Sequence, residues 1–148
     1  MTDEPQTFAG EMEIRIAPDA QLVRPVRLAM GGLASLFGFD VETIEDLRIA
    51  VNELTATVID RGDGSDLVVR LGVTPGGVMR IEVRTALGEA ADDDRFRLSD
   101  QILSVVADDH GFDTADGTAI GWLERRPTEW DDAEGGDGGP GAPDGSTE

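Results

Sequence analysis

One carboxylate stands out in the sequence because of its surroundings. Glu53 lies in residues 41–61, VETIEDLRIAVNELTATVIDR, whose apolar residues recur mostly every three or four positions. That period is typical of a helix that buries one face. Glu53 falls between Val51 and Leu54, at the edge of the apolar stripe, where a side chain could do acid–base chemistry. The alternative is an ordinary solvated carboxylate on the surface of the helix.

The composition limits the other chemistries. The chain has no cysteine, which excludes disulfides, thiolate catalysis and cysteine-based metal sites. The single histidine, His110, cannot build a zinc site alone. It precedes Gly111 at the expected end of a helix, where an imidazole would favour the negative dipole terminus. The acidic run 92–94 lacks the alternating ligand pattern of a calcium loop, which favours a solvated loop.

The charge indicates what kind of partner the chain could bind. The 148 residues suffice for about one domain and carry a net charge of −19. Residues 127–148 hold seven acids and no base, and subtracting these seven charges leaves −12 on residues 1–126. A nucleic acid or an anionic membrane surface would need a basic face, so a protein with basic patches is the more natural partner.

The sequence also predicts a location. No apolar run approaches the roughly 20 residues that a membrane span needs. The N-terminus has no basic and apolar regions of the kind that a secretory signal carries. We therefore expect the cytoplasm.

The elements that must position Glu53 follow from apolar periodicity and turn residues. In chain order, the sequence predicts a strand at 11–17, a helix at 20–37 that Pro25 kinks or delays, the helix at 41–61, a hairpin of strands 66–73 and 78–85 around a 74–77 loop, an acidic loop at 86–95, a helix at 98–108, and strands 111–116 and 118–123 about a turn at 116–117. This order predicts an α+β fold, a two-layer sandwich with the helices on one face of a mixed or antiparallel sheet. A loose arm at 1–10 and a disordered acidic Gly/Pro tail at 127–148 would flank the domain at 11–126.

Several side chains are expected in the core. On the 20–37 helix these are Leu22, Val26, Ala29, Leu33 and Leu36 or Phe37, and on the 98–108 helix Ile102, Leu103, Val105 and Val106. Trp122 is expected to join them from the last strand, while Gly38 suits the end of the 20–37 helix.

Residues 46–62, DLRIAVNELTATVIDRG, resemble the N-box helix of the GHKL superfamily of histidine-kinase-type ATPases. Within that superfamily, the layout is most similar to the RsbW/SpoIIAB type of anti-sigma factor. The N-box pattern is Glu, then Asn four residues later, then His before Gly. Glu53 matches the first position, whereas Thr57 stands in the Asn position and Arg61 in the His position.

The resemblance implies a nucleotide site that has lost most of its ligands. In the family, the Glu is the general base and the Asn holds the Mg²⁺ that bridges the phosphates. The next box, Asp-x-Gly-x-Gly, corresponds to residues 84–88, where Thr85 replaces the Asp and only Gly88 matches a glycine. The glycine-rich lid corresponds to residues 97–101, which contain no glycine. We therefore expect a degenerate ATP site with no bound cofactor and Glu53 as a vestigial base.

The resemblance also implies a function. A chain of this type would be an anti-sigma-factor-like regulator that binds a sigma factor, an anti-sigma-factor antagonist, or both. Its first long helix would face the partner, so Arg24 and Arg27 are candidate contacts, although they could instead be ordinary surface charges. Two alternatives stay open. One is an active serine/threonine kinase using ATP and Mg²⁺, and the other is an interaction module without a sigma partner, for instance a homodimer.

Overall fold

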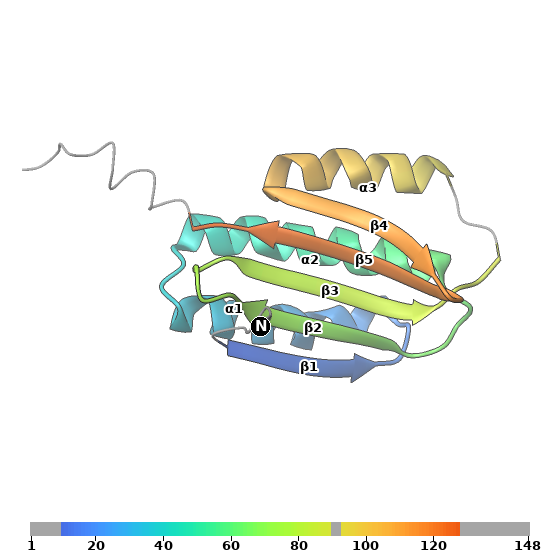
Figure 1. Ribbon diagram of the computed structural model, residues 1–148, viewed down its shortest axis with the longest axis horizontal. Helices are drawn as coiled ribbons and strands as arrows, with labels where there is room; N and C mark the ends of the chain where they lie inside the picture. Colours follow the sequence, from blue (N-terminus) through green and yellow to red (C-terminus); the bar gives the residue numbers. More distant parts are fainter. Residues whose placement is uncertain (1–9, 90–92, 128–148) are drawn as a thin grey trace, which may run out of the picture.

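A computed structural model describes residues 10–89 and 93–127 of the chain. Within these ranges, three α-helices lie against a five-stranded sheet (Figure 1). The elements in chain order are β1 (Gly10–Ile16), a 3-10 turn (Ala20–Leu22), α1 (Val23–Leu36), α2 (Val41–Arg61), β2 (Leu67–Val73), β3 (Met79–Ala86), α3 (Asp93–Val106), β4 (Asp109–Ala115) and β5 (Thr118–Arg125).

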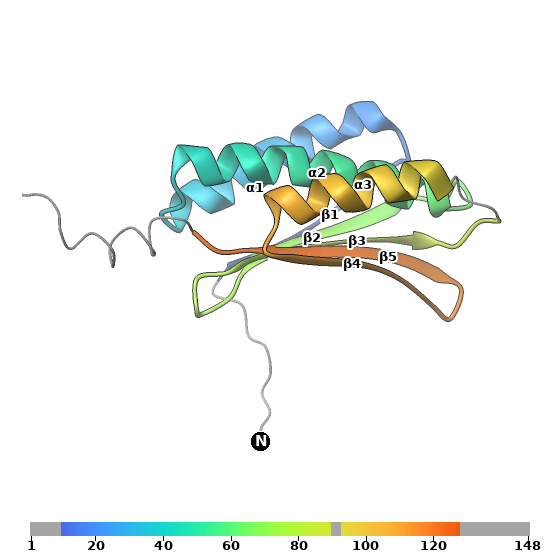
Figure 2. The ribbon, with the colours of Figure 1, turned by 90° about the horizontal axis from the view of Figure 1, so that it is seen from above.

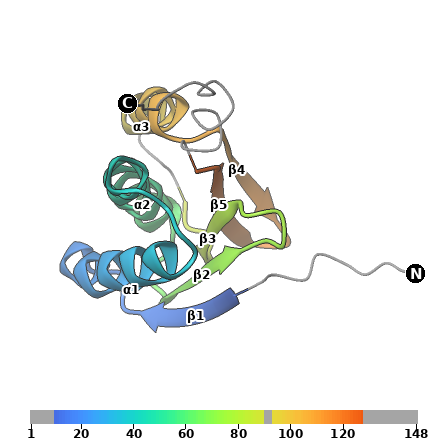
Figure 3. The same ribbon diagram turned by 90° about the vertical axis from the view of Figure 1, so that its left-hand side faces the viewer.

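The sheet is antiparallel throughout, in the order β1-β2-β3-β5-β4. All three helices lie in a row on one of its faces, as Figures 2 and 3 show from two directions. The helix α1 packs over β2, α2 packs over β3 and β5, and α3 lies beside α2 and next to β4. The predicted α+β sandwich is thus confirmed, with its helices on a single face.

Two turns fix the register of the hairpins. The β2–β3 loop closes where the Gly77 N–H donates to the Thr74 carbonyl, and Gly77 has φ 89°. The β4–β5 turn has two left-handed residues, Asp116 with φ 49° and Gly117 with φ 74°. Two successive positive φ values match the right-handed twist of an antiparallel hairpin, so both predicted turns form where expected.

The helix α2 has the predicted bounds and the predicted buried face. Asp40 caps its start by accepting a hydrogen bond from the Thr43 N–H at 2.9 Å. The hydrogen bonds from Thr43, of its side chain first and its backbone second, lower the pKa of Asp40 below the ordinary value of 3.8. The buried side chains face the sheet, and they include Leu47, Ala50, Val51, Leu54 and Val58.

A glycine in β5 lets α2 lie close to the sheet. A Cβ atom on Gly121 would fall 2.8 Å from Val58 Cγ2 and 3.0 Å from Leu54 Cδ1. The absence of a side chain at this position therefore sets the depth at which α2, and with it Glu53, sits on the sheet.

The helix α1 forms where expected but turns a different set of residues inward. Pro25 lies in its first turn, where proline is tolerated, and the 3-10 turn precedes it, so the delayed start is confirmed. Gly38, with φ 84°, ends the helix, and the Phe39 N–H donates back to the Ala34 carbonyl. The prediction that Leu36 or Phe37 would join the buried side was wrong, because these side chains are 77% and 37% exposed. The fully buried stripe of α1 is Val23, Val26, Met30 and Ala34, with Leu22, Ala29 and Leu33 partly buried beside it.

The third helix begins five residues earlier than predicted, at Asp93. The sequence 93–97 has no apolar period, so the extra turn was not visible in the pattern. Leu103 and Val106, three residues apart, form the buried stripe as expected. Val105 points to the opposite side and is 81% exposed, which contradicts the prediction.

Two further predictions, for Trp122 and His110, were wrong. For Trp122 the reason is the alternation of side chains along a strand, and for His110 it is that α3 already ends at Val106. Gly121 and Leu123 face the helices, so Trp122 between them lies on the open face of the sheet instead of in the core. His110 lies in β4 and does not cap a helix. Its Nε2 is 2.7 Å from the Asp100 carboxylate of α3.

At the ends of the domain, Gly10 pairs with Val73, so β1 begins one residue earlier than expected, and Pro127 is buried. The predicted arm and tail otherwise lie outside the described residues. None of the helices in ranges 10–89 and 93–127 combines the length and the apolar character needed to cross a membrane.

Candidate functional site

Glu53 and Thr57 meet a serine from another helix. They lie one turn apart on α2, and Ser99 of α3 sits between them. Thr57 Oγ1 donates to Ser99 Oγ at 2.6 Å, and Ser99 Oγ donates to Glu53 Oε1 at 3.0 Å. Thr57 and Ser99 are each 1% exposed, while Glu53 is half-buried. We call this contact, made by Glu53, Thr57 and Ser99, the closed seam.

The closed seam satisfies its own hydrogen bonds. Each hydroxyl has one proton to donate, Thr57 gives its proton to Ser99, and Ser99 gives its proton to Glu53. A metal bound here would have to displace Ser99 to reach Thr57. Over the described part of the chain, no group of three or more histidine, aspartate or glutamate side chains is arranged to hold a metal.

Arg61, which stands in the His position of the N-box, joins the same two helices. Its guanidinium carbon lies 4.5 Å from the ring centre of Phe96 on α3 and 5.9 Å from that of Phe112 on β4. The two rings pack edge to face with centres 5.2 Å apart. Arg61 therefore holds the first turns of α3 against the last turn of α2. Sequence reasoning missed both aromatic rings, because neither belongs to a helical stripe.

Thr85 and Gly88, which stand in the positions of the Asp-x-Gly-x-Gly box, make contacts with the backbone. Thr85 Oγ1 lies 3.1 Å from the Ser65 carbonyl oxygen and 3.0 Å from that of Asp66. The Gly88 N–H donates to the Arg61 carbonyl at 2.7 Å. A Cβ atom on Gly88 would lie 2.2 Å from the Gly62 carbonyl oxygen, so no side chain fits. These contacts close the loop after β3 onto the end of α2.

On its other side, α2 forms an exposed groove with α1. Arg24, Arg27 and Leu28 of α1 line one end together with Arg48 of α2. The groove continues over the exposed part of both helices, along Gly31, Gly32, Ser35, Val41 and Ile44. Leu28 is 73% exposed and Val41 is 77% exposed. We call this surface the open groove.

The arginines of the open groove differ in their partners. Arg27 Nη1 donates to Asn52 Oδ1 of α2 at 2.6 Å, and Arg48 lies 3.5 Å from Glu45. Arg24 makes no hydrogen bond or ion pair with any residue in the described ranges. Sequence reasoning found Arg24 and Arg27 but missed Arg48 and Asn52. Their spacing of four residues on the polar side of α2 was the available signal.

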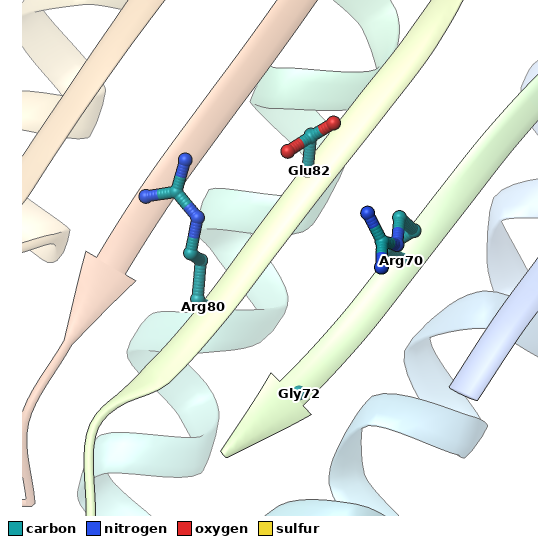
Figure 4. Close-up of a pocket in the computed structure, with 4 residues that line it drawn as sticks. All are labelled: Arg70, Gly72, Arg80 and Glu82. Carbon is teal, nitrogen blue, oxygen red and sulfur yellow. The ribbon is translucent and has the colours of Figure 1, made fainter. Parts of the chain in front are cut away.

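The uncovered face of the sheet carries a shallow depression of its own. Figure 4 shows Arg70 of β2 and Arg80 and Glu82 of β3 around Gly72, which has no side chain. Arg70 is bonded to Glu11 at 2.6 Å and Arg80 to Glu124 at 2.8 Å, while Glu82 is bonded to Arg84. These charges are paired within the sheet. This face therefore has fewer unpaired charges for a partner protein to bind than the open groove has.

No protein-family model matches the chain. The serine-protein kinase RsbW of Bacillus thuringiensis (strain Al Hakam) is 32% identical over 57 residues, which cover 38% of this chain and 36% of the relative. RsbW of Bacillus cereus (strain B4264) and of Bacillus anthracis (strain A0248) match to the same extent. The match spans about a third of the length of these curated relatives.

A solved structure agrees with these relatives. It contains the RsbU and RsbW domains of Rv1364c from Mycobacterium tuberculosis. The matched region covers 80% of this chain and 33% of the solved chain. The TM-score is 0.65 and the sequence identity is 17%, so the likeness concerns the fold. Together with the arrangement of helices on the sheet, it shows that the chain has the fold of the RsbW domain.

Proposed function

We propose that this chain is an anti-sigma-type regulator that acts by holding a partner protein, and that its ATP site is degenerate. The partner would be a sigma factor, an anti-sigma-factor antagonist, or both in competition. The RsbW-type fold supports this class of function.

The closed seam carries the second half of the proposal. In an N-box helix, the residue four positions after the Glu must face the nucleotide to hold its Mg²⁺. Here that residue is Thr57, which is 1% exposed and donates its only proton to Ser99. Glu53 accepts a hydrogen bond from the same serine. Opening the site would require α3 to leave α2, which would cost two hydrogen bonds and the packing around Arg61.

The open groove supports the first half. Its exposed leucine and valine side chains lie beside arginines on a chain that is otherwise strongly acidic. Apolar area rimmed by charge is typical of a protein-binding surface. Acidic groups on a partner would pair with Arg24 and Arg27. The rest of the domain, which is acidic, would attract basic surfaces on other parts of the partner. Capture of the partner would then weaken as salt is added.

Nucleotide binding is the decisive test. The melting temperature of the purified chain is measured with and without Mg-ATP, and we expect no shift. A ligand at 100 times its Kd stabilises a protein by about 2.7 kcal/mol, which would raise the melting temperature by several degrees. Such a rise would contradict the proposal of a degenerate site. The serine-protein kinase RsbW of Bacillus anthracis serves as the positive control.

One observation favours a second candidate, an active serine/threonine kinase. Glu53 keeps the position of the general base, and its carboxylate is held by Ser99 and half exposed. Transfer of labelled phosphate from ATP to a candidate antagonist, lost in Glu53→Gln, would establish this activity and overturn the binding-only function.

The third possibility, a module without a sigma partner, is separated by capture from cells. The tagged chain should recover a sigma factor or an antagonist together with polymerase-associated proteins. Recovery of neither, together with a self-association constant in the micromolar range or tighter by light scattering, would favour a dimerising module. The Arg24→Gln/Arg27→Gln variant is the matched control, because it should lose the partner while it keeps the fold.

A further inference from the structure

We propose that the acidic segment of this chain that follows Pro127, residues 128–148, docks in the open groove between α1 and α2. The segment contains seven carboxylates and no basic residue. The groove contains three arginines, Arg24, Arg27 and Arg48, and one acid, Glu45. The proposal joins these two oppositely charged parts of one chain.

The positive charge of the groove is matched only in part. On the α2 side, Glu45 lies 3.5 Å from Arg48, whereas the α1 side offers no acid. The helix α1 has the sequence VRPVRLAMGGLASL, which contains two arginines and no acid. Within the described residues, Arg24 has no ion pair or hydrogen bond, and the hydrogen bond of Arg27 goes to the neutral side chain of Asn52. Local positive charge on a chain of net charge −19 attracts carboxylates, and residues 128–148 carry seven of them without a basic residue.

The groove also offers apolar area for one large side chain. Leu28 and Val41 are about three-quarters exposed. Gly31 and Gly32, which also line the groove, have no side chains to fill it. Residues 128–148 contain one large apolar residue, Trp130, which stands between Glu129 and Asp131. A tryptophan flanked by carboxylates suits a site in which apolar area lies beside arginines.

The position of Pro127 makes the groove accessible to this segment. Arg125 at the end of β5 lies 3.1 Å from Asp46 in the first half of α2, and the Arg126 N–H donates to Asp108. In Figure 1, β5 therefore ends beside the N-terminal part of α2, the part that lines the groove. Twenty-one extended residues span about 70 Å, which exceeds the roughly 30 Å diameter of a domain of this size.

Because residues 128–148 belong to the same chain, they have an advantage over a separate molecule in binding the groove. A segment joined to the domain by a few residues is present at an effective concentration in the millimolar range. It would bind even where each ion pair is weak.

The two tryptophans of the chain make the docking measurable. In Trp122→Phe, the fluorescence comes from Trp130 alone. We expect its quenching by acrylamide to be lower than in a synthetic peptide of residues 128–148. In Arg24→Gln/Arg27→Gln on this background, docking should weaken about fivefold, the effect of two exposed ion pairs, and quenching should rise toward that of the peptide. Added salt should have the same effect.

The matched control is Arg15→Gln/Arg97→Gln, which changes the net charge equally at two exposed arginines of β1 and α3. This variant should leave Trp130 as protected as in the parent. Equal quenching of the chain and the peptide would overturn the proposal, as would equal effects of the two double variants. If Trp122→Phe fails to fold, the difference in emission between the full chain and Trp130→Phe gives the same signal. No nucleotide or partner is present, so failure here is separate from failure of the proposed function.

Discussion

The helix α2 has a different relation with each of its two neighbouring helices. Toward α3 it forms the closed seam, where Thr57 and Ser99 are almost fully buried and bonded to each other. Toward α1 it forms the open groove, where Leu28 and Val41 are about three-quarters exposed. In the family that the sequence resembles, the first side would hold a nucleotide and the second a partner protein.

The difference indicates which side of α2 is available for binding. Polar groups that satisfy each other in a buried place stabilise a fold and leave nothing for a ligand. Exposed apolar side chains beside unmatched charges do the opposite, because they gain by binding something. The closed seam is thus a structural contact of the domain, whereas the open groove presents apolar area and charge that another surface could cover. Four tests, ordered by the size of the expected effect, would break or sharpen this contrast.

The largest effect should come from Gly88→Ala, at the edge of the closed side of α2. The new Cβ atom would lie 2.2 Å from the backbone oxygen of Gly62, so the backbone has to move. We expect a loss of about 3 kcal/mol in the free energy of unfolding, measured by urea denaturation. Gly76→Ala is the control, because its nearest neighbour would be a side-chain oxygen at 3.8 Å. A Gly88→Ala protein as stable as the control would mean that Gly88 is free for a ligand.

Next, Ser99→Ala removes the hydroxyl that links Thr57 to Glu53. Two buried or half-buried polar groups lose their partner, so the free energy of unfolding should fall by about 1–3 kcal/mol. Ser104→Ala on the same helix is the control, since Ser104 is exposed and bonds only to the Asp100 carbonyl. That variant should stay within about 0.5 kcal/mol of the parent. If Ser99→Ala instead gains binding of Mg-ATP, Ser99 blocks a site that is otherwise able to bind the nucleotide.

On the open side, Arg27→Gln should weaken binding of the partner about tenfold without a change in stability, because truncated interface arginines typically cost more than 1 kcal/mol. Glu53→Ala should leave partner binding unchanged, because its carboxylate belongs to the closed seam. Affinity measured by calorimetry with the captured partner separates the two. Loss of binding in a folded Glu53→Ala protein would show that the partner contacts the other side of α2.

The smallest effect concerns the start of α2, which borders the open groove. The fold lowers the pKa of Asp40, so the ionised form stabilises the folded state. This contribution is fully present above the ordinary value of 3.8 and is lost as the pH falls through the lowered pKa. Asp40→Ala should therefore have a lower melting temperature than the parent at neutral pH, and the gap should close at acidic pH. A gap that stays constant below 3.8 would assign the effect to packing.

Much of the fold was predictable from the sequence, for identifiable reasons. The bounds of α2 and the two hairpin turns follow from Asp40, Gly62, Gly77 and Gly117, which act on their immediate neighbours. The buried faces of α1 and α3 were less predictable. Val105 and Leu36 are as apolar as their buried neighbours, and only the direction from which the sheet and α2 approach decides which of them is covered.

The candidate site divides in the same way. Glu53 and Thr57 could be placed on one face of a helix from their spacing of four residues, and the departures from the family pattern were visible as residue types. Nothing in the local sequence links Ser99 to them, because it follows 42 residues after Thr57. The role of Gly88 was likewise hidden, since its close neighbour is the backbone at Gly62.

The sequence by itself therefore determined the order of the elements, the helix that carries Glu53 and the segregation of acids into the last residues. These depend on periodicity, turn chemistry and composition, which act over a few neighbouring positions. Only the tertiary structure decided that one side of α2 is sealed by Ser99 and the other left open beside Arg24 and Arg27. Burial and hydrogen bonding between distant residues depend on how the helices pack on the sheet, and no short stretch of sequence contains that information.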